Sequence, residues 1–523
     1  PDAIKNTTLI KGGMQANFGG RLSSVIDISM KEGNNRHYSL KGGIGWIASR
    51  LTAEGPLAKG KSSFLVSARR TYLLDLAQPF IQETNFAGTN YFFYDLNTKL
   101  NFRFSDKDRL FFSTYFGRDV LSFKSSERGV SFGLPYGNAT ATLRWNHLFG
   151  PRSFLNTSLI YNDYDFGFEG GQGEWDFNLS SGVKDWNFKM DLDYFPGTSH
   201  EVKLGLNAIY HTLTPNVTRA SNGETTFTNG FEPRYAGEFA IYAQDQWEIS
   251  PAISIHAGLR MVYFAQFGPF TEGVTGEKYD QSDIVADYTA VEPRFNMRWR
   301  FNENSSFKAS FTRANQFVHL VSNSSSTLPG DIWVSSSRRV KPQQGTQYAA
   351  GYFRNFANNN WESSVELYYR DLKNQIDYRE TYQNDLTAEL EQEFVFGSGR
   401  AYGAEFFMKK NRGDLTGWLG YTLSKTDRQF EDINQGQRFP ARYDRRHDVS
   451  LVLNYSLGSK WDLGTTFVFG SGQAFTPVER LYFIDRNLVQ EYGERNSARL
   501  NDYHRLDLSL IYTPGVGKEK DFS

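Results

Sequence analysis

The sequence has no cysteine among its 523 residues. A disulfide framework and a thiolate metal site are therefore both excluded. Net charge is also missing, because 57 Lys and Arg residues nearly balance 58 Asp and Glu residues and leave a formal charge of -1. A chain without a basic surplus cannot neutralise many phosphates, so nucleic acid is not an expected partner. Finally, no uninterrupted apolar run approaches the ~18 residues of a transmembrane helix.

Aromatic residues, in contrast, are abundant. They make up 16% of the chain, with 29 Tyr and 44 Phe, yet the mean hydropathy is -0.53. A soluble protein this rich in aromatic residues would normally carry a larger aliphatic core. An outer-membrane β-barrel needs aromatic girdles, a lipid-facing apolar set and a polar lumen, so it is hydrophilic on average. The composition therefore favours a transmembrane barrel over a soluble β protein.

Apolar and polar residues alternate strictly in many segments, as in RFNMRWRF at residues 294–301. Only a β-strand converts period two into two distinct faces. The same alternation recurs near residues 185–194, 255–264, 447–457 and 505–513. These runs of roughly 10–15 residues are longer than the usual strand of about 5–6. Their length and alternation predict a wall between lipid and water, an all-β transmembrane antiparallel β-barrel.

The charged face of such a strand is expected to turn inward, because a charge facing lipid costs about 2–4 kcal/mol at the midplane. Arg294, Arg298 and Arg300 are therefore candidate lumen charges. Two roles are considered for these arginines. They guide an anionic solute, or they pair with carboxylates on neighbouring strands or on an inner domain. Pairing is the expected role, with Asp27 as one possible kind of partner.

Connection lengths give a second signal. Short turns such as SDKD (105–108), FGPR (149–152) and NRGD (411–414) alternate with long polar segments such as 212–234, 315–345 and 472–500, and this alternation is expected to be unbroken. Short periplasmic turns and long extracellular loops are typical of outer-membrane barrels. Counting in this way predicts about 19 strands from near His37 to near Thr513. Because bacterial barrels of this kind close with an even number of strands, the barrel at residues 36–523 is expected to be incomplete at its C-terminal end.

Two motifs carry a family resemblance. The stretch KGGMQANFGGRLSSVIDISMKEGN near the N-terminus resembles the last plug strand of the TonB-dependent outer-membrane receptors, most closely those of Bacteroidota; its matching residues include Gly12, Gly13, Phe18, Gly19, Gly20, Arg21 and Asp27. A later stretch, RFPARYDRRHDVSLVLNY, matches a strand-start motif of the same family, with Asp444, Arg445, Arg446 and His447 in register. We interpret this second group as a polar anchor at an extracellular strand start.

The resemblance implies a barrel of 22 strands occluded by an N-terminal plug. Residues 1–35 would then be the C-terminal remnant of the plug domain with its linker, preceded in the full protein by a signal peptide, a TonB box and most of the plug. Gly19 and Gly20 would act as a hinge that lets the backbone turn tightly. Val25 to Ile28 would pair inside the plug sheet.

The function that the resemblance implies is active import at the bacterial outer membrane. A large or scarce solute, of the siderophore, glycan, peptide or cobalamin class, would cross after the periplasmic protein TonB rearranges the plug. The expected partners are outer-membrane lipid, TonB, and a surface lipoprotein or other outer-membrane subunits. The rival hypothesis is a non-transporting barrel subunit that scaffolds a larger outer-membrane complex.

Candidate ligand-binding groups are fewer. The aromatic run Tyr91, Phe92, Phe93 and Tyr94 is interpreted either as loop aromatics that stack on sugar or siderophore rings or as part of an interfacial girdle. No enzyme activity, cofactor or metal site is predicted. His447 and Asp448 are neighbours on one strand and point to opposite faces, so they cannot converge as a catalytic triad requires.

Overall fold

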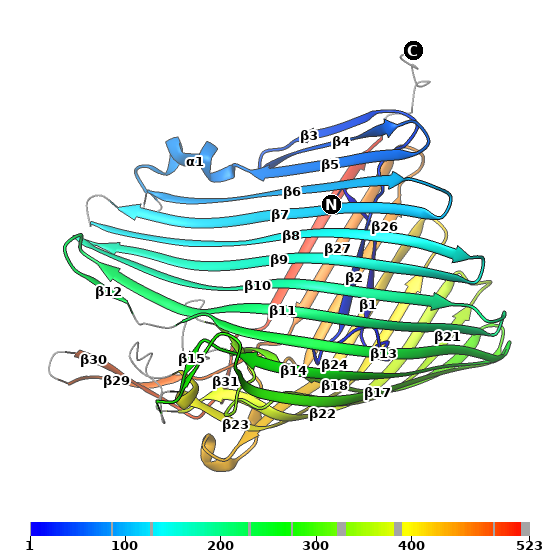
Figure 1. Cartoon of the computed structure of the whole chain (residues 1–523). Helices are drawn as coiled ribbons and strands as arrows, with labels where there is room; N and C mark the ends of the chain where they lie inside the picture. The colour runs from blue at the N-terminus through cyan, green and yellow to red at the C-terminus, as the bar shows by residue number, and fades with distance from the viewer. Residues whose placement is uncertain are drawn as a thin grey trace.

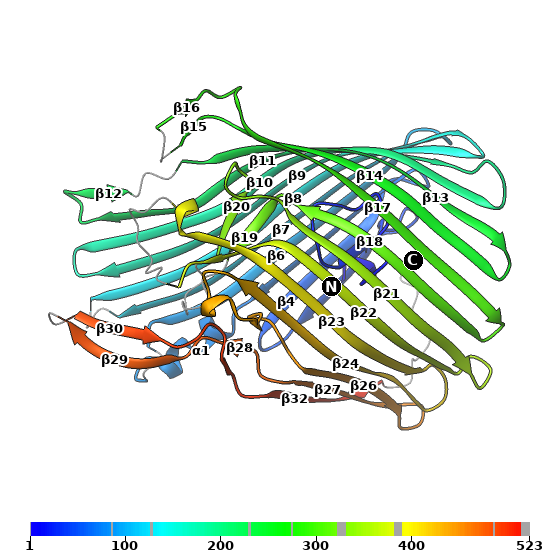
Figure 2. The ribbon, with the colours of Figure 1, turned by 90° about the horizontal axis from the view of Figure 1, so that it is seen from below.

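The computed structural model of the chain describes residues 2–84, 87–125, 129–228, 232–272, 276–321, 331–380, 390–484 and 487–513. The stretch PGVGKEKDFS after Thr513, whose sequence predicts a further short periplasmic turn, lies outside these residues. Within them the protein is almost entirely β-structure. Its largest sheet curves into a barrel around the N-terminal segment (Figure 1, Figure 2).

Each strand of the barrel wall pairs antiparallel with the next wall strand along the chain. The first half of the wall consists of β3 (Ser39–Ile44), β4 (Ala48–Ala58), β5 (Ser62–Thr71), β6 (Thr89–Arg103), β7 (Asp108–Ser125), β8 (Val130–Gly150), β9 (Ser153–Gln172), β10 (Trp175–Tyr194), β11 (His200–Ser221) and β13 (Arg234–Ser250). The second half consists of β14 (Ile253–Phe267), β17 (Ile284–Asn302), β18 (Ser305–Gln316), β21 (Gln343–Phe356), β22 (Trp361–Tyr378), β23 (Phe394–Lys410), β24 (Leu415–Phe430), β26 (His447–Ser456), β27 (Trp461–Gly470) and β32 (Tyr503–Tyr512). The predicted fold class is confirmed, and the described wall holds twenty long strands where about 19 were expected.

The alternation in the sequence sorts side chains between the two faces of this wall. On β17, Phe295 and Trp299 are 42% and 48% exposed on the outer face, whereas Arg294 is 2% exposed on the inner face. On β10, Trp186 and Phe188 are exposed while Asn187 bonds to Asn207 of β11. Because consecutive side chains of a strand point to opposite sides, the apolar set faces lipid and the charged set faces the lumen.

The two ends of the barrel differ. At one end, short turns join the strands, and at the other lie the longer connections with their own small elements (Figure 1). These elements are α1 (Leu73–Ile81), β12 (Thr226–Thr228), β15 (Phe270–Thr271), β16 (Lys278–Tyr279), β19 (Val318–Val321), β20 (Ile332–Ser335), η1 (Leu390–Glu393), η2 (Asn434–Gly436), β25 (Phe439–Pro440), β28 (Ala474–Phe475), β29 (Val478–Ile484), β30 (Asn487–Tyr492) and β31 (Ala498–Arg499). None of the helices in the described segments is long and apolar enough to cross a membrane.

The expected unbroken alternation of short and long connections is wrong in the first half of the wall. Strands β8 to β11 run for 21, 20, 20 and 22 residues, and only Gly173 and Glu174 separate β9 from β10 at the end of the barrel where the long connections lie. The polar residues that elsewhere form loops here continue the ladder beyond the apolar band. Backbone pairing satisfies their peptide groups as well as a solvated loop would.

Inside the barrel lies a hairpin of β1 (Ile4–Ile10) and β2 (Val25–Met30), as both views show (Figure 1, Figure 2). The two strands are antiparallel, with Thr7 opposite Ile28 and Leu9 opposite Ile26. The expected pairing of Val25 to Ile28 is therefore confirmed. Residues 11–24 connect the two strands and reach the wall, and we refer to them as the inner loop.

The outer face of β13 allows a test of the lipid-facing assignment. Ile241 is 62% exposed near the middle of the strand, and Ile249 lies near the short-turn end. Ile241→Arg is expected to lower the free energy of unfolding by about 2–4 kcal/mol, while Ile249→Arg costs only about 0–1 kcal/mol because its side chain lies near the interface. Urea titration of lipid-reconstituted protein measures both values. Equal costs at the two positions would contradict a membrane midplane at Ile241.

Candidate functional site

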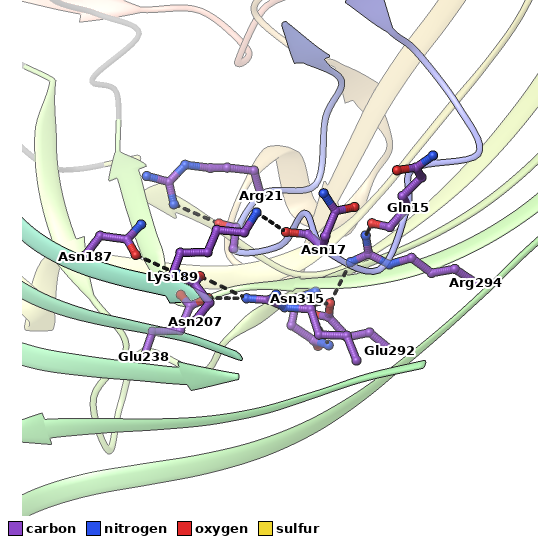
Figure 3. Close-up of polar contacts among 12 residues, drawn as sticks. Gln15, Asn17, Arg21, Asn187, Lys189, Asn207, Glu238, Glu292, Arg294 and Asn315 are labelled. Atoms are coloured by element: carbon purple, nitrogen blue, oxygen red, sulfur yellow. Dashed lines mark hydrogen bonds and ion pairs between the residues drawn. The ribbon is translucent and has the colours of Figure 1, made fainter. Parts of the chain in front are cut away.

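The backbone of the inner loop is held by polar side chains of the wall (Figure 3). These contacts come from three different strands: Arg294 of β17 donates to the carbonyl oxygen of Gln15, the amide of Ala16 donates to Gln244 of β13 at 2.8 Å, and Lys189 of β10 donates to the carbonyl oxygen of Asn17 at 3.1 Å. Because the wall recognises backbone atoms of the loop, the contact depends on the position of the loop as much as on its side chains.

Below this contact lie two arginines and two glutamates on adjacent strands. Arg260, Arg294, Glu238 and Glu292 are each 3% exposed or less. Arg294 bonds to Glu292 at 2.8 Å, and Arg260 lies 3.7 Å from Glu238 and 4.0 Å from Glu292. The four charges sum to zero, which is what burial of ionised groups requires.

The hydrogen bonds of this group are nevertheless incomplete. Within the described residues, Nε and Nη1 of Arg260, Nε of Arg294 and Oε1 of Glu238 have no hydrogen-bond partner. An ionised group buried with unused bonding capacity is less stable than one that is fully bonded. Water that reaches these atoms when the loop leaves would offset part of the lost contact. The arrangement therefore favours a loop that is held in place but can be removed.

Two glycines let the inner loop approach the buried charges. A Cβ atom at Gly19 would lie 2.4 Å from Nε of Arg260, a distance at which the buried Arg260 side chain would have to move. Gly20 has φ +72, a conformation that glycine adopts without strain, and its Cβ would lie 3.2 Å from a carboxylate oxygen of Glu238. The structure thus explains these glycines by close approach, and the hinge role stays a prediction.

The remaining loop and plug-strand candidates occupy different places. Phe18 lies with its ring 5.6 Å from Nζ of Lys189, and the Arg21 guanidinium lies 5.8 Å from the Trp333 ring of β20. Asp27 is exposed on β2 opposite Thr8.

Two of the three ladder arginines pair with carboxylates and the third with a backbone carbonyl, and the suggested partner Asp27 is wrong. Arg294 bonds to Glu292, and Arg298 lies 3.4 Å from Glu248. Arg300 donates to the carbonyl oxygen of Pro251 at 2.6 Å. These partners lie on β17, on β13 and in the turn between β13 and β14, close to the arginines, whereas Asp27 is held in the β1–β2 ladder.

A hairpin from the connection between β18 and β21 lies near the inner loop within the barrel. It consists of β19 and β20, and β20 contacts β10 and β11. Its apolar residues Val321, Ile332 and Val334 pack with Ile376 of β22 and Phe394 of β23. The hairpin therefore spans the lumen between two parts of the wall, and Trp333 brings it against Arg21.

Within this hairpin His319 is completely buried, and its Nε2 lies 3.0 Å from the hydroxyl of Ser336. Burial, with the nearby Arg21 guanidinium as a second cause, lowers the pKa of His319 to about 3. The imidazole is thus neutral at physiological pH. Contact between the hairpin and the inner loop does not depend on its protonation there.

The aromatic run Tyr91 to Tyr94 lies in strand β6, so its interpretation as loop residues is wrong. Phe93 faces inward, with the Arg69 guanidinium 4.6 Å from its ring, and Tyr91 on the same face donates to Asp119. Phe92 and Tyr94 stack on the opposite face with centroids 6.3 Å apart. The outer pair suits an interfacial girdle, and the inner pair lines the lumen.

The DRRH group lies where the chain enters β26. Asp444 is 2% exposed, accepts from the amide of Thr426 at 2.6 Å and bonds to Arg499. The amides of Arg446 and His447 both donate to the hydroxyl of Ser471, at 2.9 and 3.0 Å. The group thereby joins β24, β26 and the segment after β27, as expected of a strand anchor.

This anchor gives a direct prediction. Asp444→Ala leaves the Thr426 amide without its acceptor and is expected to cost about 1–3 kcal/mol locally. Segment 472–500 should then be cleaved faster by protease added to intact cells. Asp448→Ala, which removes a partly exposed ion pair 3.6 Å long with Arg445, is the control and is expected to cost less than about 1 kcal/mol. Equal cleavage rates would show that Asp444 does not anchor the segment.

The neighbours His447 and Asp448 bind different partners in the structure. His447 bonds to Tyr421 at 2.9 Å, whereas Asp448 pairs with Arg445. Among the residues that the structure describes, no group of three or more His, Asp or Glu side chains is placed to hold a metal ion.

Several residues at the loop contact were not predicted, namely Lys189, Glu238, Gln244, Arg260 and Glu292. One signal was available for Glu292, because it stands two positions before Arg294 and therefore shares its face. The others lie on β10, β13 and β14, and their convergence on the inner loop depends on strand register.

The comparisons with known proteins agree with this architecture. Residues 65–523 match the family model described as TonB dependent receptor-like, beta-barrel. A search of curated proteins finds no match. The assignment to receptors of Bacteroidota stays a prediction.

Solved structures resemble the chain in fold. The FrpB iron transporter of Neisseria meningitidis (F3-3 variant) aligns with TM-score 0.70 and 13% identity over 98% of this chain and 81% of the other. The ferric yersiniabactin uptake receptor FyuA of Yersinia pestis aligns with TM-score 0.65 and 11% identity over 93% and 74%. The ferric citrate transporter FecA aligns with TM-score 0.67 and 13% identity over 97% and 76%.

Barrels of this kind are integral to the outer membrane, as the lipid-facing belt of this wall requires. With its family model matched over most of its length, the chain belongs to the TonB-dependent receptor β-barrel family.

Proposed function

We propose that this protein imports a scarce or large solute across the outer membrane, with the energy supplied through TonB by rearrangement of the inner hairpin and its loop. The observation that carries the proposal is the contact between the inner loop and the wall. Polar groups of β10, β13 and β17 hold the loop backbone, and the charges beneath it are balanced but incompletely bonded.

The contact between the inner loop and the wall suits a segment that moves during transport. The hydrogen bond from the Ala16 amide is neutral and contributes about 0.5–1.5 kcal/mol net, and those from Arg294 and Lys189 involve a charge and contribute about 1.5–3 kcal/mol each. Mechanical work applied to the N-terminal side can therefore break these contacts in sequence. The wall, in contrast, is held by continuous ladders between twenty strands. Order would be lost in the inner segment while the barrel stays intact, which is a known type of switching transition.

The solute remains to be assigned by experiment. The structural neighbours include proteins described as importing iron, ferric yersiniabactin and ferric citrate, and one described as a copper transporter. Metal chelates are therefore the first class to test, followed by cobalamin, glycans and peptides. A surface lipoprotein partner is a further proposal, to be tested by co-purification.

The experiment is a growth screen of a deletion strain in which each solute class is limiting. The expected result is a growth defect on at least one class, reproduced by deletion of TonB and repaired by the intact gene. No defect on any class, together with stable co-purifying outer-membrane proteins, would instead support the non-transporting scaffold.

A further inference from the structure

Two pockets lie between the inner loop and one part of the wall. The first, of about 200 Å³, is lined by Gly12 and Gly13 of the loop and by β14, β17, β18, β21 and β22 near their short-turn ends. We call it the turn-side pocket. The second holds only about 10 Å³ and is lined by Lys11, Met14 and Leu22 of the loop with Thr312, Gln347 and Arg370 of the wall. We call it the loop-side pocket, because its lining residues lie nearer the barrel end with the long connections.

Each pocket is lined by a buried polar side chain with unused bonding capacity. His256 lines the turn-side pocket and is 9% exposed, and its Nε2 has no hydrogen-bond partner among the described residues. Thr312 lines the loop-side pocket and is 6% exposed, and its hydroxyl likewise lacks a partner in the described part of the chain. Buried polar groups are normally bonded, so these atoms point to a polar occupant.

Gly12 lines both pockets and Gly13 lines the turn-side pocket, so the backbone of these two glycines lies where the pockets meet. A Cβ at Gly12 would lie 3.1 Å from Nε2 of Gln347 and 3.7 Å from Cβ of Ala349. A Cβ at Gly13 would lie 2.1 Å from Oδ1 of Asn296, and Gly13 has φ +62. The part of the barrel wall that faces these glycines carries small residues, with Gly345, Ala349 and Gly351 on the inner face of β21. Displacing the Gly12–Gly13 backbone would join the pockets.

The lining of both pockets is cationic on balance. Arg298 and Lys308 face the turn-side pocket with Glu366 as the one carboxylate in its lining, and Arg298 is paired at 3.4 Å with Glu248, which lies outside the lining. Lys11 and Arg370 face the loop-side pocket, whose lining includes no acidic residue. Arg370 bonds to the neutral Gln347 at 3.0 Å, although Lys11 is neutralised by Glu405.

We propose that solute crosses the barrel along the inner face of β17, β18, β21 and β22, through these two pockets, and that this route selects anionic solutes. The Gly12–Gly13 backbone closes this route between the two pockets. The inference rests on the proposed import function and adds to it a path and a charge class. The buried charges around Arg260 and Glu292 lie outside it, because they are paired with one another.

Conductance of the full-length protein in planar lipid bilayers tests the route, with potassium chloride as the probe. Gly13→Val cannot seat its side chain against Asn296 and is expected to open discrete channels that pass chloride severalfold better than potassium. Gly60→Val is the matched control, because Gly60 also has positive φ, +74, but a Cβ there meets nothing within 4 Å. Its conductance should stay at the level of the unaltered protein.

A second substitution locates the current on this wall. Ala349 faces the route, whereas the preceding residue, Tyr348, is 53% exposed on the outer face of β21 and lines neither pocket. In the Gly13→Val background, Ala349→Trp should lower the conductance at least about twofold, since it narrows the pore, and Tyr348→Trp should leave it unchanged. Equal effects of the two, or a folded Gly13→Val protein without conductance, would overturn the route.

Thiol labelling gives an independent measurement if Gly13→Val does not fold. The chain has no cysteine, so Ser310→Cys in the turn-side pocket and Ser67→Cys on the inner face of β5, where the hydroxyl bonds to neutral Thr52, each present one thiol. The ratio of modification rates by a sulfonate-bearing and a trimethylammonium-bearing methanethiosulfonate should be severalfold higher at position 310. Equal ratios would overturn the charge selectivity. If the growth screen shows no defect while the conductance and labelling results are as expected, import is overturned but the path through the barrel is not.

Discussion

A disulfide that joins Ala16 of the inner loop to Gly258 of β14 is expected to stop solute uptake. A Cβ at Gly258 would lie 2.9 Å from Cβ of Ala16, and disulfides join Cβ atoms about 3.5–4.5 Å apart, so a small shift accommodates the bond. The native chain has no cysteine, so Ala16→Cys with Gly258→Cys forms one defined link. A covalent bond is far stronger than the loop contacts, which contribute about 0.5–3 kcal/mol each, so the pull that removes the loop would no longer suffice.

Uptake of the solute identified by the growth screen is the measurement. Under oxidising conditions the linked variant should transport at the level of the deletion strain, and a reductant should restore transport. Each single cysteine variant should transport normally under both conditions. Thr52→Cys with Ser67→Cys is the matched control, because their hydroxyls lie 2.8 Å apart on neighbouring wall strands β4 and β5. Normal uptake by the oxidised Ala16–Gly258 variant would mean that the loop stays on the wall during transport.

Period two in the sequence predicts most of the barrel because the membrane imposes it on each strand. Arg294 and Phe295 are adjacent, yet one is buried in the lumen and the other faces lipid. The same rule fails at residues 91–94, where both faces of β6 are aromatic and no alternation marks the strand. It also fails for β8 to β11, whose polar ends continue the ladder where a loop was expected.

The connections were the least predictable part of the fold. The hairpin of β19 and β20 is stabilised by contacts of Val321 and Ile332 with Ile376, Tyr378 and Phe394, which are distant in the sequence. Its strands have four residues each, too short for a period to be recognised. Long-range packing of this kind cannot be read from a single segment.

The candidate site was predicted in part for a related reason. The glycine-rich motif indicated Gly19 and Gly20, and alternation indicated that Arg294 faces inward. The partners Glu238 and Arg260 were missed because Glu238 stands opposite Phe264 in the β13–β14 register, so its contact with Arg260 is diagonal. Register between strands, and the position of the loop within the lumen, come only from the assembled barrel.

The buried pair of Glu292 and Arg294 is expected to show the largest effect of a single substitution on stability. Glu292 is fully buried and accepts from Arg294 at 2.8 Å and from the Asn315 amide at 2.7 Å. Glu292→Leu leaves Arg294 buried without its counter-charge, which is expected to cost about 3–5 kcal/mol. Arg294 also holds the carbonyl oxygen of Gln15, so the inner loop should loosen.

Urea titration of the purified protein, followed by protease cleavage within residues 11–24, measures both effects. Glu292→Leu combined with Arg294→Met should recover much of the loss, because replacing both partners of a buried pair removes the uncompensated charge. Arg298 lies on the same face of β17 as Arg294 and forms a half-exposed pair with Glu248 of β13. Arg298→Met breaks this pair and should lower the free energy of unfolding by less than about 1 kcal/mol. If Glu292→Leu lowers the free energy of unfolding no more than Arg298→Met does, burial does not strengthen the Glu292–Arg294 pair. The inner loop is then held by its backbone contacts alone.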